Sequence, residues 1–173
     1  MQVTRGHAGH AGALVDLVTA CFTQSEGAAE GAAVGQLIAD LMTDGRAELF
    51  CAEEAGQVVA VVAFSPLIYP ADAGGAAGQV RLLSPMAVAT PCQRRGLGQG
   101  LIRAALQDLA GRGADRVLTY GDPAYYARFG FARITTAQAA PPWPLSMAQG
   151  WQGLALAGGV WADLVGPSTC LPA

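Results

Sequence analysis

A glycine-rich segment between two apolar stretches most constrains the fold of this chain. Val80–Ala89 is predicted to be a β-strand, and Leu97–Leu109 places its apolar residues at helical spacing. Between them lies Pro91–Gly100, with the sequence Pro-Cys-Gln-Arg-Arg-Gly-Leu-Gly-Gln-Gly. Gly96 and Gly98 lack a Cβ atom, so the main chain can turn tightly and approach a ligand closely. The segment therefore predicts a strand, a glycine-rich turn and a helix in succession.

This turn has the chemistry of an anion-binding site. The first N–H groups of a helix lack intrahelical partners and lie at the positive end of the helix dipole, which favours phosphate. Arg94 and Arg95 are the only adjacent pair among the ten arginines, and they fall in this turn. An ordinary helix start with surface arginines is the alternative that these features alone leave open.

Two common phosphate-binding motifs are excluded by the residues present. A Walker A loop needs a lysine, and the chain has none. The dinucleotide pattern G-x-G-x-x-G would begin at Gly96, but Gly100 follows Gly98 too soon to be its third glycine.

The remaining patterns predict a mixed domain of strands and helices, of the α+β or α/β class. Further strands are expected at Gln2–Arg5, Glu48–Glu53, Gln57–Phe64, Arg116–Tyr120, Phe131–Ile134, Trp151–Leu156 and Val160–Val165. Further helices are expected at His10–Phe22, at Val34–Met42 and, as a short turn, at Ala124–Arg128. Gly27–Gly35 and Pro70–Gly78 are predicted loops, and Pro85 is expected to interrupt its strand. The change of character after Ala139 predicts a main domain at 1–139 and a C-terminal extension, 140–173, that packs on it.

Composition limits the classes of function. The chain has 173 residues, a net charge of −3 and only 13% charged residues, so a basic face for nucleic acid or anionic membrane is not expected. No apolar run reaches the roughly 18 residues of a membrane helix. The four cysteines and two histidines lack metal-ligand spacing, so no metal site is expected. Scattered cysteines and an N-terminus without a signal-peptide pattern predict a cytoplasmic protein.

Two separated motifs resemble the GNAT superfamily, the Gcn5-related N-acetyltransferases. Gln93-Arg94-Arg95-Gly96-Leu97-Gly98 matches its Q/R-x-x-G-x-G/A signature, and Tyr125–Phe131 is similar to its Y-x-x-x-G-F element. Leu83–Val88 resembles the fourth strand of that fold, and Gly121–Tyr126 is most similar to a bacterial branch of predicted N-acetyltransferases. The resemblance implies a central, mixed and mostly antiparallel sheet that is splayed between strands 4 and 5 and flanked by helices.

The resemblance also implies that acetyl-CoA is the acyl donor. Its pyrophosphate would bind the N–H groups of the turn, and its pantetheine would lie in the gap between strands 4 and 5. The implied cofactor-binding residues are Met86, Ala87, Val88, Gln93, Arg94, Arg95, Gly96, Leu97, Gly98 and Gln99. Pro85 fits a bulge at that gap, because proline cannot donate to a β-ladder. A strand that simply begins at Met86 is the alternative.

Tyr126 occupies the family's tyrosine position, four residues before Gly130, and is the candidate general acid for the leaving thiolate. The alternative is that Tyr126 only packs against the cofactor. Val80–Ala89 carries no carboxylate, unlike the corresponding strand of many family members. The general base therefore stays unassigned among Glu53, Glu54, Asp72, Asp122 and a water relay.

The implied function is transfer of the acetyl group of acetyl-CoA to a primary amine of a small molecule, by direct attack in a ternary complex. Two alternatives stay open: a catalytically silent acyl-CoA-binding or sensing module, and an acetyltransferase that acts on a protein amine. No nucleic acid or membrane partner is expected, and a homodimer is a candidate assembly.

Overall fold

The computed structural model describes residues 2–6, 9–70, 79–156, 158–159, 161–164 and 166–170. The chain forms two compact units, each described by itself. Unit 1 comprises Met1–Ser65 and Ser84–Ala105, and unit 2 comprises Pro66–Leu83 and Leu106–Leu171. The predicted Pro70–Gly78 loop lies, except for Pro70, outside the described residues.

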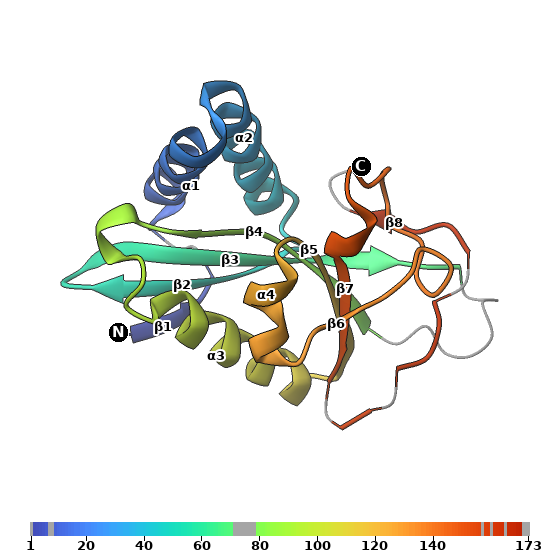
Figure 1. Cartoon of the computed structure of the whole chain (residues 1–173). Coiled ribbons are helices and arrows are strands. Elements are labelled where there is room, and N and C mark those ends of the chain that lie inside the picture. Colours follow the sequence, from blue (N-terminus) through green and yellow to red (C-terminus); the bar gives the residue numbers. More distant parts are fainter. Residues whose placement is uncertain are drawn as a thin grey trace. The chain divides into compact units, whose positions relative to one another are not determined.

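Unit 1 contains strands in the order β1-β2-β3-β4. β1 (Gln2–Arg5) pairs antiparallel with β2 (Glu48–Glu54), and β2 pairs antiparallel with β3 (Gln57–Ile68) across the predicted Ala55-Gly56 turn. β4 (Gln79–Val88) follows β3 in the sheet. Helices α1 (Ala11–Glu26) and α2 (Ala28–Asp44) lie together on one face of these strands, and α3 (Leu97–Gly111) begins on the other (Figure 1).

The two N-terminal helices are longer than the sequence patterns predict. The prediction of a loop at Gly27–Gly35 is wrong, because α2 begins at Ala28. Gly31 and Gly35 are buried where α2 crosses α1, and a Cβ atom at Gly31 would lie 2.8 Å from the carbonyl oxygen of Thr19. Glycine lowers helix propensity, but here its small size permits the close contact, and packing outweighs propensity.

One hydrophobic core cluster of unit 1 lies between this helix pair and the strands. Leu14 and Val18 of α1, and Ile38 and Leu41 of α2, are at most 1% exposed, consistent with i, i+3 and i, i+4 spacing. The strands contribute Leu49, Cys51, Val61, Ala63 and Ala87. As predicted, α2 ends at Gly45, which takes the left-handed conformation (φ 72°) that caps many helices.

Unit 2 contains strands in the order β4-β5-β7-β6, with β3 beside β4. These are β5 (Ala114–Tyr120), β7 (Trp151–Ala155), β6 (Ala132–Arg133) and β8 (Thr169–Cys170), which pairs with Leu67–Ile68 of β3. The helical segments are α4 (Pro123–Tyr126), the 3₁₀ turns Ala127–Phe129 and Ala148–Gly150, and the second part of α3. Trp151 is fully buried in the core of unit 2, and its indole N–H donates to the Ala139 carbonyl.

The expected fold class is confirmed. Strands β4 and β5 are parallel, whereas β1 with β2, β2 with β3, β3 with β8, β5 with β7 and β6 with β7 pair antiparallel. Pairing between β4 and β5 ends at Leu83 and Thr119, although β4 continues to Val88, as expected for a sheet that splays there.

Two expectations about strands are wrong. β4 runs without interruption through Pro85, whose peptide bond with Ser84 is cis. In the described part of the predicted strand Val160–Val165, Trp161–Asp163 are not in a strand, and Leu164 forms only an isolated bridge with Ala139. The domain boundary at 139 stays a prediction. Among the described helices, none combines the length and hydropathy needed to cross a bilayer.

Candidate functional site

The predicted anion-binding turn lies in unit 1, between the end of β4 and the start of α3. After β4, the 3₁₀ turn Thr90–Cys92 leads into exposed residues 93–96, and α3 begins at Leu97. Arg94 (φ 59°) and Gly96 (φ 80°) both have positive φ values, which are typical of tight turns. The first turn of α3 carries no acidic side chain, so nothing in it opposes the binding of an anion.

The two arginines of the turn differ in their partners. Arg95 forms a two-pronged ion pair with Glu54 of β2, with Nη1–Oε2 and Nη2–Oε1 distances of 3.1 and 3.2 Å. Among the described residues, no hydrogen bond or ion pair involves the side chain of Arg94. The guanidinium available to an anion at this turn is therefore that of Arg94.

The end of β4 is held by hydrogen bonds with α1 and β3, which precede it in the chain, and with Gln93, which follows it. The Val88 carbonyl accepts hydrogen bonds from Gln93 Nε2 (3.0 Å) and from the Cys21 thiol of α1 (3.2 Å). Burial raises the pKa of Cys21, opposed by its hydrogen bond to Val88, so this thiol remains a protonated donor. The Ala89 N–H donates to Val59 of β3. Because successive strand residues point their N–H groups to opposite edges, the Val88 N–H faces away from β3.

The sequence patterns do not predict that α1 contacts the end of β4 and the turn that follows it. Besides Cys21, Gln24 of α1 contacts this region, because its side-chain oxygen accepts a hydrogen bond from Thr90. These two positions are three apart on α1 and lie more than 60 residues from their partners, 67 for Cys21 and 66 for Gln24. A single sequence carries no signal for such long-range contacts.

Tyr126 lies at the end of α4, in unit 2. Asp122 caps this short helix by accepting a hydrogen bond from the Ala124 N–H (2.9 Å), and Pro123 opens it. Burial raises the pKa of Tyr126, and a side-chain hydrogen bond between Tyr126 and Thr119 lowers it by a smaller amount. Near pH 7 the phenol is therefore neutral and carries a proton that it can donate.

The candidate bases have other partners. Glu53 Oε1 lies 3.4 Å from Thr4 Oγ1 and 3.5 Å from His10 Nε2, and Glu54 pairs with Arg95. Asp122 is the helix cap, and Asp72 lies outside the described residues. The contacts of the described carboxylates therefore single out none of them as the general base.

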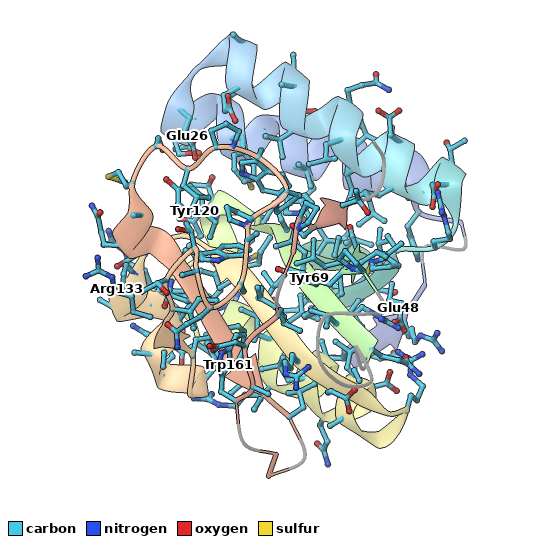
Figure 2. All side chains as sticks on the ribbon, turned by 90° about the vertical axis from the view of Figure 1, so that its right-hand side faces the viewer. Glu26, Glu48, Tyr69, Tyr120, Arg133 and Trp161 are labelled. Atoms are coloured by element: carbon cyan, nitrogen blue, oxygen red, sulfur yellow. The ribbon has the colours of Figure 1, made fainter. Side chains whose placement is uncertain are left out.

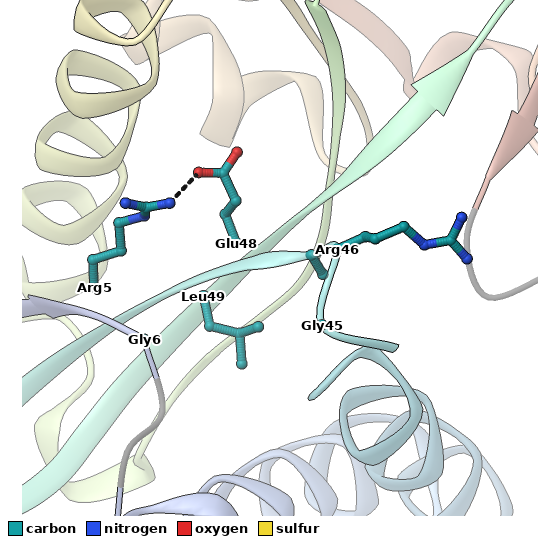
Figure 3. Close-up of a pocket in the computed structure, with 7 residues that line it drawn as sticks. Arg5, Gly6, Gly45, Arg46, Glu48 and Leu49 are labelled. Atoms are coloured by element: carbon teal, nitrogen blue, oxygen red, sulfur yellow. Dashed lines mark ion pairs between the residues drawn. The ribbon is translucent and has the colours of Figure 1, made fainter. Parts of the chain in front are cut away.

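A hollow of about 480 Å³ in unit 1 lies where β1 ends and β2 begins (Figure 3). Its charged side chains already have partners, because Arg5 pairs with Glu48 at 3.2 Å and Arg46 pairs with Asp44 at 2.6 Å. Within the described ranges, no cluster of three or more histidine, cysteine, aspartate or glutamate side chains could hold a metal ion. The turn before α3 is therefore the stronger candidate for a charged ligand.

Residues 12–131 match the model of the acetyltransferase (GNAT) family. The chain belongs to this family. The matched region includes both the turn before α3 and Tyr126.

Relatives of this GNAT chain include an uncharacterized N-acetyltransferase, YhbS, of Escherichia coli K12. The two sequences are 38% identical over 97 residues, which are 55% of this chain and 56% of YhbS. The sequence match therefore spans little more than half the length of that curated relative.

Solved structures extend the comparison to nearly the full chain. The crystal structure of E. coli YhbS in complex with CoA has a TM-score of 0.82 at 28% identity and covers 98% of this chain and 88% of that one. A GNAT acetyltransferase from Brucella melitensis in complex with acetyl-CoA has a TM-score of 0.72 at 25% identity and covers 98% and 93%. Tetrahymena Gcn5, at 14% identity and a TM-score of 0.65 with coverage of 93% and 99%, shares the fold.

Proposed function

We propose that this chain is an N-acetyltransferase that transfers the acetyl group of acetyl-CoA to a primary amine of a small molecule. One observation carries the proposal: the turn before α3 presents an Arg94 side chain without a partner in the described structure, next to a helix start without acidic residues. Structural relatives of the same family are complexed with CoA and acetyl-CoA. The residues present thus fit a pyrophosphate.

In this proposal the N–H groups of residues 94–99 bind the pyrophosphate, as helix starts favour anions. The cofactor-binding set is Met86, Ala87, Val88, Gln93, Arg94, Arg95, Gly96, Leu97, Gly98 and Gln99. Within this set, the Gln93 side chain acts indirectly: its Nε2 donates to the Val88 carbonyl and so holds the end of β4 in place. Val88 contributes its N–H, which faces away from β3, to the pantetheine or to the developing oxyanion.

The chemistry is a direct displacement. A neutral amine attacks the thioester carbonyl, a C–N bond forms, and the C–S bond breaks with its electron pair on sulfur. Tyr126 gives its proton to that thiolate, in the role of general acid. The amine loses a proton to water, because the contacts of Glu53, Glu54 and Asp122 assign none of them to this task.

The proposal is tested by incubating the chain with acetyl-CoA and a panel of primary amines that includes diamines, amino sugars, amino acids and one peptide. Free thiol is followed continuously, and the acetylated product is identified by mass spectrometry. We expect steady thiol release that depends on a small-molecule amine. Transfer to the peptide alone would overturn the choice of acceptor.

One observation favours a second candidate, an acyl-CoA-binding module without activity. β4 carries no carboxylate, and the described candidate bases are engaged elsewhere. This candidate predicts CoA binding without thiol release for any amine of the panel. The same assay therefore separates the two functions.

A further inference from the structure

A buried hydroxyl lies at the point where β4 and β5 stop pairing. Thr119 is fully buried, and its Oγ1 donates a hydrogen bond to the Leu83 carbonyl at 3.2 Å. Leu83 and Thr119 are also the last pair in the register of the two strands. A side chain therefore supplies a donor to β4 where the ladder between the main chains ends.

The ring of Tyr126 is enclosed by a cluster of aromatic rings in the same unit. The ring centroids of Tyr125, Phe131 and Phe129 lie 5.2, 5.6 and 6.4 Å from that of Tyr126. Such contacts limit rotation of the ring about its side-chain bonds.

Gly121 completes this enclosure. A Cβ atom at Gly121 would lie 2.8 Å from Cε2 of the Tyr126 ring, so the ring occupies space that only glycine leaves open. The Gly121 main chain is itself fixed, because its N–H donates to the Gly150 carbonyl at 3.0 Å and its carbonyl accepts from Gln152.

Thr119 connects the two features. Its hydroxyl has one hydrogen and faces two acceptors, the Leu83 carbonyl and the Tyr126 oxygen. With a neutral phenol, the hydroxyl donates to Leu83. A phenolate attracts the same hydrogen more strongly, because hydrogen bonds to charged groups are the stronger ones.

We infer that Thr119 and Gly121 are positioning residues for Tyr126 in acetyl transfer, with Thr119 bonding the phenol oxygen and Gly121 making room for its ring. This inference rests on the proposed function. When the O–H bond of Tyr126 breaks, its proton forms the S–H bond of coenzyme A, and the electron pair stays on the phenol oxygen. The Thr119 hydroxyl then turns from Leu83 to that oxygen until solvent returns a proton.

The test is a double-mutant cycle on kcat and on the KM for acetyl-CoA, with Thr119→Val and Tyr126→Phe. We expect Tyr126→Phe to lower kcat about a hundredfold, as for loss of a general acid. Thr119→Val should lower kcat about tenfold, as for loss of a hydrogen bond to a charged group, with little change in KM. In the Tyr126→Phe background, Thr119→Val should have almost no further effect. With Tyr126 present, Thr119→Ser should keep kcat near the wild-type value, because serine retains the hydroxyl.

Gly121→Ala provides a second variant that keeps Thr119, and Gly111→Ala is its matched control. A Cβ at Gly111 has no atom within 4 Å, so this control should keep wild-type kcat, whereas Gly121→Ala should lower it. Additive losses in the cycle, or no rescue by serine, would overturn the inference while leaving the proposed function in place. An inactive wild-type protein would overturn the proposed function itself.

Discussion

At the scale of single residues, the turn before α3 separates two neighbouring arginines by their partners. Arg95 is neutralised by Glu54, whereas the Arg94 side chain has no partner within the described part of the chain. The sequence alone does not distinguish Arg94 from Arg95, because the partner of Arg95, Glu54, lies 41 positions away in the chain. Only the folded hairpin of β2 and β3 brings that carboxylate to the turn.

This difference predicts unequal roles in cofactor binding. Arg94→Gln should weaken CoA binding about tenfold or more, because a charge-assisted hydrogen bond to phosphate is lost. Glu54→Gln, the matched control, should not weaken it, because this change frees the Arg95 guanidinium. Calorimetric titration of both variants with CoA provides the measurement, and equal affinity of Arg94→Gln and wild type would contradict the assignment.

At the scale of elements, much of the fold follows from sequence patterns. The order of strands and helices through β6 is as predicted, because apolar periodicity and the Ala55-Gly56 and Asp44-Gly45 turns mark the elements clearly. The prediction fails at the start of α2, where glycines typical of a loop serve the contact with α1. It also misses β8, whose two residues are too short for a periodic pattern.

The helix contact itself can be tested by paired glycine substitutions. Gly31→Ala should destabilise the protein by about 1–3 kcal/mol, because its Cβ would overlap the Thr19 carbonyl of α1. Gly12→Ala, in α1 with no atom within 4 Å of the added Cβ, should be neutral or stabilise by up to about 1 kcal/mol. Urea unfolding measures both changes. Equal effects of the two substitutions would show that helix propensity, and not contact, decides.

At the scale of the whole molecule, buried neutral acids make stability sensitive to alkali. Burial raises the pKa of Tyr69 to about 12 and that of Cys51 to about 11, from ordinary values of 10.0 and 9.0. Tyr69, labelled in Figure 2, is buried in unit 2. Its hydroxyl donates to the Ala140 carbonyl at 2.8 Å. Between its ordinary and its raised pKa value, each group is mostly ionised in the unfolded chain and mostly neutral in the folded one.

The contribution of these two groups to the free energy of unfolding should therefore be constant up to about pH 9 and fall as pH rises from 9 through 12, because the unfolded state then binds fewer protons than the folded state. Tyr69→Phe should show a shallower decline. This variant keeps the Ala140 carbonyl satisfied, because Ser168 Oγ also donates to it at 2.7 Å. Urea midpoints between pH 8 and 11 give the comparison, and identical slopes for the two proteins would exclude Tyr69 as a cause.

The binding of coenzyme A at the turn before α3 is the claim on which the proposed function depends. Calorimetric titration of the wild-type chain, Gly96→Glu and Gly45→Glu with CoA tests it most directly. Gly96 and Gly45 both have positive φ (80° and 72°) and open space around an added Cβ, so the two variants share the same backbone strain. We predict that wild type and Gly45→Glu bind CoA and that Gly96→Glu, which places a carboxylate at the turn, does not. Unchanged affinity in Gly96→Glu would contradict the account.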